Sequence, residues 1–513
     1  MKNFMIQLAV ALASSGAAMA SPCDTLRDAL TTRTLTADRS YVLEGMVKIE
    51  NGQVLTIDPN VTICAMPGSG LVIEKGGRLY ANGTAGNMIT FTSAQPAGLK
   101  APGDWTGIVF IGDAGNNKPA DLIQRGALQY RYGGTDDTYS GGIMRYVSIE
   151  YAGQVTGSNT HNAALVAGAL GSATVMEYIQ VLESGSDGIR LLGGMNNLSH
   201  IYIQNAHKND ISIAYGYRGA IQELLAVKNT RMRTFDINSA GISVINNELS
   251  STATPHTFPL INSFTLAGPQ QCGSLPGDRS AGLFFDHNSA GTFENGVVSG
   301  FDHNIVIQDN LSASRTATDL TLRYLSIGNA GTQIADFRGS SWTPCGADII
   351  NWLQTDPCGT SGNIQYDAVV QDYHTTICDD YCDNAPVFQL GQSTEISKRE
   401  DLEQYAGALQ NIPVFTWVNT CPAAGCCANT HRTWQSLECY PNPARHTVTL
   451  AVPVTAGTAH VRVIHIHTGR LVYQAEVSAG NIDLDIAHYP AGSYLVQVQT
   501  PDIIYQGIVQ KSE

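Results

Sequence analysis

The segment Met144-Arg-Tyr-Val-Ser-Ile-Glu-Tyr151 carries an alternating apolar and polar pattern that returns three times downstream. Met176–Glu183 repeats it after 32 residues, Leu198–Asn205 after a further 22 and Ile221–Lys228 after a further 23. A second series, offset by 22 residues, pairs Gly188–Leu192 with Asp210–Ala214 and Leu283–Phe285 with Ile305–Ile307. Short alternating runs that recur every ~20–30 residues, with Gly, Asn and Asp between them, are typical of a solenoid. We therefore predict an all-β chain built around a parallel β-helix, whose coils stack strand on strand.

The alternation also assigns faces to the strands, because successive side chains of a strand point to opposite sides. One inward ladder is expected to hold Val147, Ile179, Ile201 and Leu224, and a second to hold Ile149, Val181, Ile203 and either Ala226 or Val227. The outward ladder mixes polar and apolar residues: Ser148, Glu150, Gln180, Leu182, Tyr202, Gln204 and Leu225. A flat, extended face of this kind suits long polymers such as glycans, and a merely solvated sheet is the plainer alternative. The solenoid is expected to be right-handed and to run from about Val42 to Phe337.

Length and composition narrow the class of protein. The 513 residues predict two to four domains at roughly 150 residues each. Charged residues make up 14%, against about 25% in ordinary soluble domains, and the 51 glycines fit a turn-rich β protein. The formal net charge of −15 leaves no basic surface for phosphates, which argues against binding to nucleic acid or to an anionic membrane.

The N-terminus has the features of a secretory signal peptide covering residues 1–20. Lys2 supplies the charge, Phe4–Ala13 is mostly apolar, and Ala18-Met19-Ala20 is a cleavage signal. A lipoprotein would use Cys23, but Pro22 does not suit a lipobox. No later run approaches the ~20 apolar residues that span a bilayer, so we expect no transmembrane segment and an exported, soluble mature chain.

Eleven cysteines remain after that cleavage, and eight of them lie between Cys345 and Cys439. Because exported proteins are oxidised, we predict a loop-rich segment, 341–436, stapled by disulfides, with at least three bridges between Cys345 and Cys439. A zinc site that uses Cys378 and Cys382 with Cys426 or Cys427 is the alternative. The odd total leaves at least one cysteine free or intermolecular.

The last part, 437–513, has the rhythm of a small β-sandwich, with short strands every 8–12 residues. Tyr440-Pro-Asn-Pro-Ala444 opens it, Gly469 lies in a turn, and Gly492 and Tyr494 belong to Pro490-Ala-Gly-Ser-Tyr-Leu-Val-Gln-Val498. The order of these motifs resembles the type A C-terminal sorting domain of the type IX secretion system, with Tyr440, Pro441, Asn442, Pro443, Gly469, Gly492 and Tyr494 at the motif positions. The resemblance implies passage across the outer membrane by the type IX machinery, followed by removal of the domain.

The predicted β-helix domain, 21–340, also carries a resemblance, over roughly residues 40 to 340. Gly103–Val109, Arg145–Gly153, Gly216–Gly219 and Ile261–Pro269 resemble, in order, a family of secreted, pectate-lyase-like β-helix proteins of Bacteroidota. Members of that family carry acidic clusters where this chain has Ser184–Gly194 and Lys208–Ile213, which retain few carboxylates. We therefore expect no cofactor, with calcium as the only alternative.

Two groups of residues are candidates for chemistry. Phe-Asp-His-Asn occurs twice, so that Asp286, His287, Asp302 and His303 could form a metal or acid/base cluster, although the offset of 16 does not match the coil and the composition also suits turns. Asp187, Lys208 and Asp210, with Arg190 nearby, are the candidate catalytic residues for adjacent coils. His465 and His467 share a strand face of the last domain, where exposed alternating positions explain them more simply.

Two hypotheses for the function follow. The chain has no GxSxG, HExxH or P-loop motif and no complete catalytic constellation, so a non-enzymatic secreted or cell-surface protein that binds glycan, matrix or another cell is favoured. A polysaccharide lyase or glycoside hydrolase on the same scaffold is the alternative.

Overall fold

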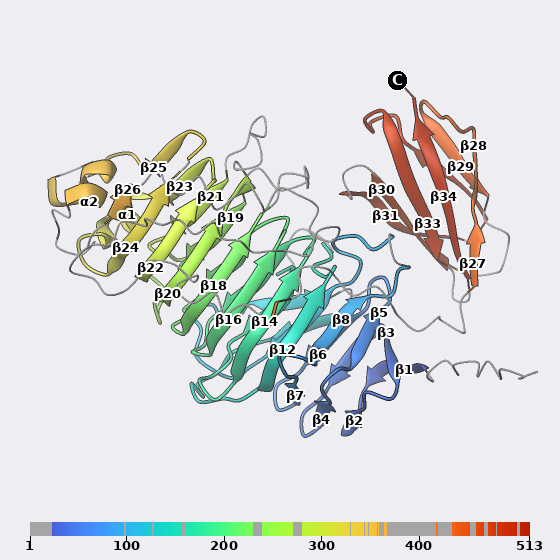
Figure 1. The fold of residues 1–513 in the computed structure, drawn as a ribbon, viewed down its shortest axis with the longest axis horizontal. Coiled ribbons are helices and arrows are strands. Elements are labelled where there is room, and N and C mark those ends of the chain that lie inside the picture. The colour runs from blue at the N-terminus through green and yellow to red at the C-terminus, as the bar shows by residue number, and fades with distance from the viewer. Residues whose placement is uncertain are drawn as a thin grey trace, which may run out of the picture.

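The fold is described from a computed structural model (Figure 1). The structure describes residues 23–96, 99–125, 128–155, 161–228, 239–269, 280–328, 330–342, 344–346, 348–355, 358, 364–366, 417–418, 433–451, 458–465, 470–478, 480–499 and 503–512. The expected signal peptide lies outside these residues and stays a prediction. Within them, no helix is long and apolar enough to cross a membrane.

The β-helix is a stack of coils whose strands pair in parallel into one 24-stranded sheet with three sides (Figure 1). Side A contains β2 (Arg33–Leu35), β4 (Val54–Ile57), β7 (Arg78–Asn82) and the first halves of β12 (Gly142–Glu150), β14 (Val175–Leu182), β16 (Asn197–Gln204), β18 (Ala220–Val227), β20 (Leu260–Ala267), β22 (Gly291–Ser299) and β24 (Leu320–Gly328). Side B contains β1 (Cys23–Ala29), the start of β3 (Ser40–Ile49), β5 (Thr62–Ala65), β8 (Ile89–Ser93), the second halves of β12 to β24, and β26 (Ile364–Tyr366).

Side C contains the end of β3, β6 (Gly70–Ile73), β9 (Gly107–Ile111), β13 (Ala163–Gly168), β15 (Asp187–Leu192), β17 (Ile211–Ala214), β19 (Ala240–Ile245), β21 (Ala281–Asp286), β23 (His303–Ile307) and β25 (Gln333–Phe337). Two short helices, α1 (Asn310–Arg315) and α2 (Ile349–Thr355), lie in the last coils. The predicted fold class is confirmed. The stack begins earlier than the expected Val42, because β1 already pairs with β3.

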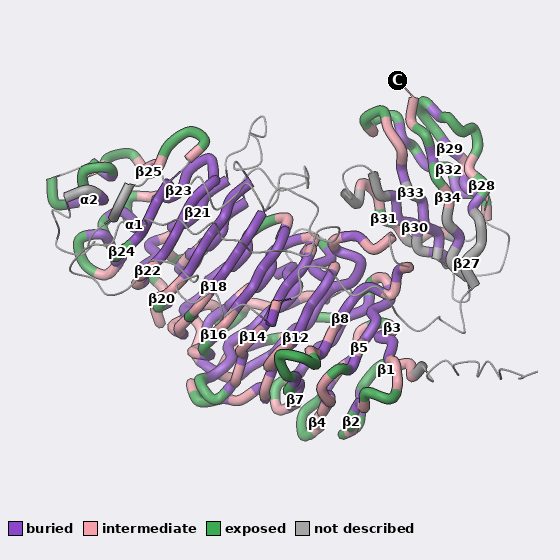
Figure 2. The backbone as a smooth tube through the Cα atoms, in the orientation of Figure 1, coloured by how far each residue is buried: buried purple, intermediate pink, exposed green. Residues whose placement is uncertain are grey.

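The inward ladders are confirmed residue by residue. Val147 pairs with Ile179, Ile179 with Ile201 and Ile201 with Leu224, and all four side chains are buried in the main core. The second ladder takes Ala226 rather than Val227, since Ile203 pairs with Ala226. Buried positions run along the strands from the first coils to the last (Figure 2). Stacking identical positions therefore produces one continuous core.

The corner between sides A and B is a single residue in the left-handed region in each of the coils from β12 to β24. The corner residues are Tyr146, Tyr178, His200, Glu223, Ser263, Asn295 and Tyr324, with φ between 50 and 58°. A left-handed conformation costs a residue with a Cβ roughly 1–2 kcal/mol. Stacking along the column offsets part of that cost: the Tyr146 and Tyr178 rings are 4.2 Å apart, and the Tyr178 and His200 rings 4.0 Å.

The outward ladder on side B departs from expectation, because it is neither open to polymers nor solvated. Its seven side chains, from Ser148 to Leu225, are each at most 3% exposed. Trp417 packs on Leu182, Tyr202 and Leu225 and lies edge-on to Tyr146 and Tyr178. The polar members bond within the ladder, since Gln180 donates to Ser148 at 2.7 Å and Ser148 donates to Glu150 at 3.0 Å. The prediction that this ladder forms an open glycan-binding face is therefore wrong.

The C-terminal domain consists of two sheets around one core. The larger holds β27 (Thr433–Ser436), β34 (Ile503–Lys511), β33 (Gly492–Gln499), β30 (Thr458–His465) and β31 (Arg470–Ser478), and the smaller holds β28 (Glu438–Tyr440), β29 (Thr447–Ala451) and β32 (Asn481–Asp485). Among the described residues, the first strand of this domain is β27, just before the expected boundary at 437.

Several motif residues of this domain make backbone contacts. Asn442 donates to the Ile508 carbonyl at 2.6 Å and accepts from the Gln510 amide at 2.8 Å, which fixes the motif segment to β34. The buried Tyr494 donates its hydroxyl to the Pro490 carbonyl at 2.7 Å. Gly469 and His467 lie outside the described residues.

The cysteine predictions are tested only in part. Cys345 and Cys358 form a disulfide, Cys64 is also disulfide-bonded, and Cys439 is free. Cys378, Cys382, Cys426 and Cys427, which the alternative zinc site would use, lie outside the described residues. At least three bridges between Cys345 and Cys439 therefore stays a prediction.

Candidate functional site

A polar network lies on the outer surface of side C, where an apolar cover ends. Val109 pairs with Val166, Val166 with Arg190, and Arg190 with Ser212, so these residues form one outward row. The hairpin of β10 (Leu122–Arg125) and β11 (Leu128–Arg131) covers the valines through Ile123 and the following Tyr132. Arg190 is the first charged residue of the row after these valines.

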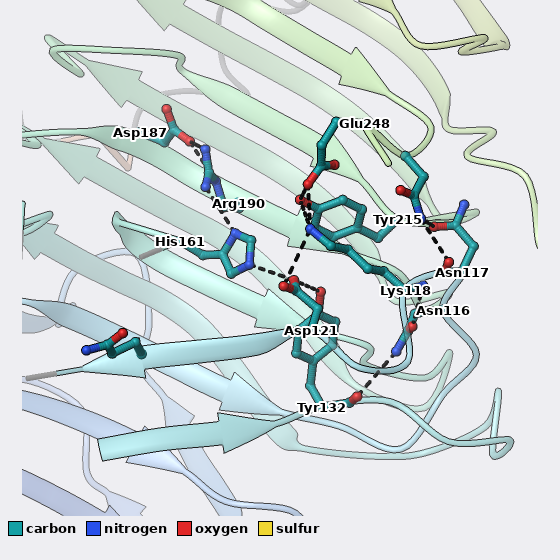
Figure 3. A network of polar contacts seen from close by, with 12 residues as sticks. Asn116, Asn117, Lys118, Asp121, Tyr132, His161, Asp187, Arg190, Tyr215 and Glu248 are labelled. Atoms are coloured by element: carbon teal, nitrogen blue, oxygen red, sulfur yellow. Dashed lines mark hydrogen bonds and ion pairs between the residues drawn. The ribbon is translucent and has the colours of Figure 1, made fainter. Parts of the chain in front are cut away.

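Asp121 is the centre of the network (Figure 3). Its carboxylate accepts from the Tyr132 hydroxyl at 2.6 Å, contacts His161 Nε2 at 2.7 Å and lies 3.5 Å from Lys118 Nζ. His161 lies two residues before β13 begins, and its carbonyl accepts from the buried Arg125 at 3.0 Å. Four side chains of the network are 11 to 19% exposed, so each is mostly buried but still accessible to solvent: Lys118, Asp121, His161 and Arg190.

The partners of His161 fix its protonation. Arg190 Nη1 lies 3.2 Å from His161 Nδ1, and because a guanidinium can only donate, Nδ1 accepts and Nε2 donates to Asp121. Burial lowers the pKa of His161, with the Arg190 charge acting in the same direction against Asp121. Burial would raise the pKa of Asp121, but hydrogen bonds from His161 and Tyr132 and the Lys118 charge outweigh it and lower the pKa to about 2. The resting pair is thus a neutral imidazole beside a carboxylate.

Lys118 joins this pair to a second carboxylate. Its ammonium donates to the Tyr215 hydroxyl at 2.9 Å and to Glu248, and lies 4.3 Å above the Tyr215 ring. Burial would lower the pKa of Lys118, but the hydrogen bonds with Glu248 and Tyr215 raise it. Burial raises the pKa of Tyr215 to about 12. At neutral pH, Lys118 is therefore a cation, Glu248 an anion, and the Tyr215 hydroxyl keeps its proton.

Asparagines hold the insertion 112–141 that carries Lys118. Asn117 donates to Asn246 at 2.8 Å, and Asn247 donates to the Asn117 carbonyl at 3.0 Å, which brings Lys118 beside Glu248. Asn116 donates to the Tyr132 carbonyl at 3.3 Å and ties the two ends of the insertion together (Figure 3).

The candidate catalytic residues fall into two ion pairs on adjacent coils, with Lys208 outside both. Asp187 is fully buried, holds Arg190 at 2.6 Å and accepts from the Asn209 amide at 3.1 Å, so it supports the network from below. Asp210 pairs with Lys228 at 2.9 Å, and both side chains are fully buried. Lys208 is exposed, and its carbonyl accepts from Lys228 at 2.7 Å. Only Asp187, through Arg190, belongs to the site.

The candidate metal residues do not meet. Asp286 ends β21, whereas His303 pairs with Ala281 at the start of that strand. Within each pair the contact is local: His287 to Asp286 at 3.0 Å and His303 to Asp302 at 3.0 Å. Among the described residues, no three His, Cys, Asp or Glu side chains are grouped closely enough to hold a metal ion.

Most of the network escapes sequence reasoning. Lys118, Asp121 and Tyr132 belong to the insertion, and His161, Tyr215 and Glu248 lie just outside the strands of side C, where no repeat position marks them. Arg190 is the exception, because a charge inside the apolar run Gly188–Leu192 is a detectable signal.

Comparison with known proteins adds a family description for both parts. Residues 28–341 match the family described as a pectate-lyase like beta helix domain, and residues 438–509 match the secretion system C-terminal sorting domain. Among solved structures, the enzymatically active domain of tailspike protein 2 of bacteriophage CBA120 aligns at 10% identity and a TM-score of 0.20, over 96% of this chain and 72% of that one. No curated protein gave a significant match.

Proposed function

The chain belongs to the family of pectate-lyase-like β-helix domains, and from that premise we propose that it binds an extracellular polysaccharide through the network on side C. Its type IX sorting domain directs it to the cell surface or the medium, where polysaccharides and matrix are the polymers it meets. The ligand would lie across the coils, with Lys118, Arg190 and Glu248 as its polar contacts.

The pairing of every ionisable group in the network supports binding over catalysis. Asp121 and Glu248 face Lys118, and Asp187 faces Arg190, so each carboxylate has a cation beside it. Side chains held by such contacts lose little further freedom when a ligand binds, which favours affinity. Lys118 and Tyr215 keep their protons at neutral pH, because the pKa of Tyr215 is raised to about 12 and that of Lys118 is also raised, so neither of them can act as the base.

The test is binding to a panel of neutral, uronate-containing and sulfated polysaccharides by affinity electrophoresis. Lys118→Gln and Arg190→Gln should each weaken binding by about tenfold or more, the loss expected when a hydrogen bond to a charged group is removed. Lys208→Gln is the matched control, because Lys208 is exposed and its side chain is outside the network. Binding that survives both network variants unchanged would exclude this surface.

A lyase remains the second candidate, because one observation favours it over a hydrolase. A neutral, partly exposed His161 has Nδ1 directed at Arg190, so a ligand carboxylate that attracted Arg190 would free Nδ1 to accept a proton. The carboxylates a hydrolase would need, Asp187 and Asp210, are fully buried in ion pairs. Unsaturated sugar ends that appear with the natural chain and vanish with His161→Ala would establish the lyase.

A further inference from the structure

Three polar residues form a row across the larger sheet of the sorting domain. Arg462 on β30 pairs with Gln474 on β31 and with Gln497 on β33. Its strand neighbours Val461 and Val463 point into the core of the domain, so the row lies on the opposite face.

Each residue of this row meets a polar partner on the β-helix, at the turn from side B to side C. Gln154 donates to Gln474 at 3.1 Å. Arg462 Nη2 donates to Asp104 Oδ1 at 3.0 Å. The side-chain amides of Gln95 and Gln497 exchange two hydrogen bonds, at 3.2 and 3.1 Å. The three residues of the sorting-domain row therefore each pair with one polar residue of the β-helix.

The ion pair in the middle is withdrawn from water. The Asp104 side chain is fully buried and that of Arg462 is 4% exposed. Asp104 Oδ2 already accepts from Ser93 Oγ and from the Ala101 amide at 3.0 Å, which leaves Oδ1 aimed at the guanidinium. The β-helix thus presents a fixed carboxylate, and removing its cation would leave a buried charge without compensation.

The same contact has features of one that opens. Within the described residues, Arg462 Nε and Nη1 are buried without a hydrogen-bond partner, and such groups destabilise the closed arrangement. Polar contacts between domains of one chain also permit relative movement more readily than large apolar ones.

We propose that these contacts form a latch that holds the sorting domain on the β-helix before export. The row of Gln474, Arg462 and Gln497 cannot contact the β-helix and the secretion machinery at once. The machinery therefore reaches this face only after the latch opens, and a chain whose latch is broken presents it permanently.

Hydrogen exchange of the purified chain 21–513, read by mass spectrometry, tests whether the latch closes. Arg462→Glu should speed exchange of the amides of 101–106 by about tenfold or more, because truncating one partner of a buried charge pair is expensive. Arg445→Glu is the matched control, since Arg445 is exposed on the same domain. Arg462→Met, which removes the charge without reversing it, should act in the same direction. Small-angle scattering should show a larger radius of gyration for both Arg462 variants only.

Export kinetics test the second half of the proposal. In a host with the type IX machinery, the Arg462→Glu chain should reach the surface at least as fast as the natural chain and the Arg445→Glu chain. Arg462 variants that match the control in exchange and in scattering would overturn the latch. Slower export of an Arg462 variant that is shown to be undocked would overturn its role as a barrier.

Discussion

Replacing Lys228 by Met tests whether the candidate acid Asp210 is structural. The Lys228 ammonium donates to Asp210 at 2.9 Å and to the carbonyls of Ala206 and Lys208 at 2.7 Å each, in a fully buried place. Met fills the volume but leaves a carboxylate and two carbonyls without their donor. Breaking a buried ion pair by removing one partner costs about 3–5 kcal/mol, so we expect a loss of about 4 kcal/mol in the free energy of unfolding at pH 8.

The loss should depend on pH in a definite direction. Burial already raises the pKa of Asp210 from 3.8 to about 6, with Lys228 opposing it. Without the ammonium the folded-state pKa rises further, so at pH 5 Asp210 is protonated and is buried uncharged. The unfolded chain ionises at its ordinary pKa, and the deficit of the variant therefore grows as pH rises from about 5 to 8.

Urea unfolding of the chain 21–513, followed by tryptophan fluorescence and circular dichroism, measures this difference. Lys208→Met is the control. It removes the same charge from an exposed side chain two residues before Asp210, so it should leave the urea midpoint unchanged. Asp210→Leu combined with Lys228→Met should recover much of the loss, since both buried charges go together. Equal midpoints for the two single lysine variants at pH 8 would refute the reasoning.

Three further outcomes are expected. Burial raises the pKa of Glu183 from 4.5 to about 7, so this side chain should lower stability by up to about 3 kcal/mol as pH rises between these values, and Glu183→Gln should remove its contribution to the slope in pH-dependent urea unfolding. Ile201→Asp places an unpaired carboxylate in the core ladder and should prevent folding, whereas a natural thermal transition in that variant would contradict the inward assignment. Mapping of non-reduced peptides should recover Cys345–Cys358 with at least two more bridges before Cys439, and six or more free thiols would favour the metal alternative.

The ladders could be read from the sequence because two periods, the strand alternation and the 22-residue offset, both act on the same residues. Val147 and Ile201 are apolar at matching positions, and burial follows from that alone. The left-handed corners gave no such signal, since Tyr146 and Glu223 are not residues that prefer that conformation.

The site and the covered side B depended on contacts between distant segments. The sequence around Tyr202 predicts that its side chain points outward, but it does not tell whether water or Trp417 covers that side chain. Likewise, His161 and Asp121 meet only because a hairpin docks on Val109 and Val166, an apolar contact that no spacing encodes. Sequence patterns therefore predict the repeat, but they do not predict which outward faces the inserted segments cover.

The one-residue corners have a consequence for engineering. From β12 to β24, side A passes to side B through a single residue in every coil, whereas the turns from B to C and from C to A vary in length and carry the insertions. One added residue at Glu223 would move the following half-strand to the wrong face, since strand positions alternate. Grafted loops, epitopes or binding peptides therefore belong at the other two turns. In each of these coils, the corner between sides A and B must keep its length to preserve the strand register, whereas the other two corners tolerate changes in length.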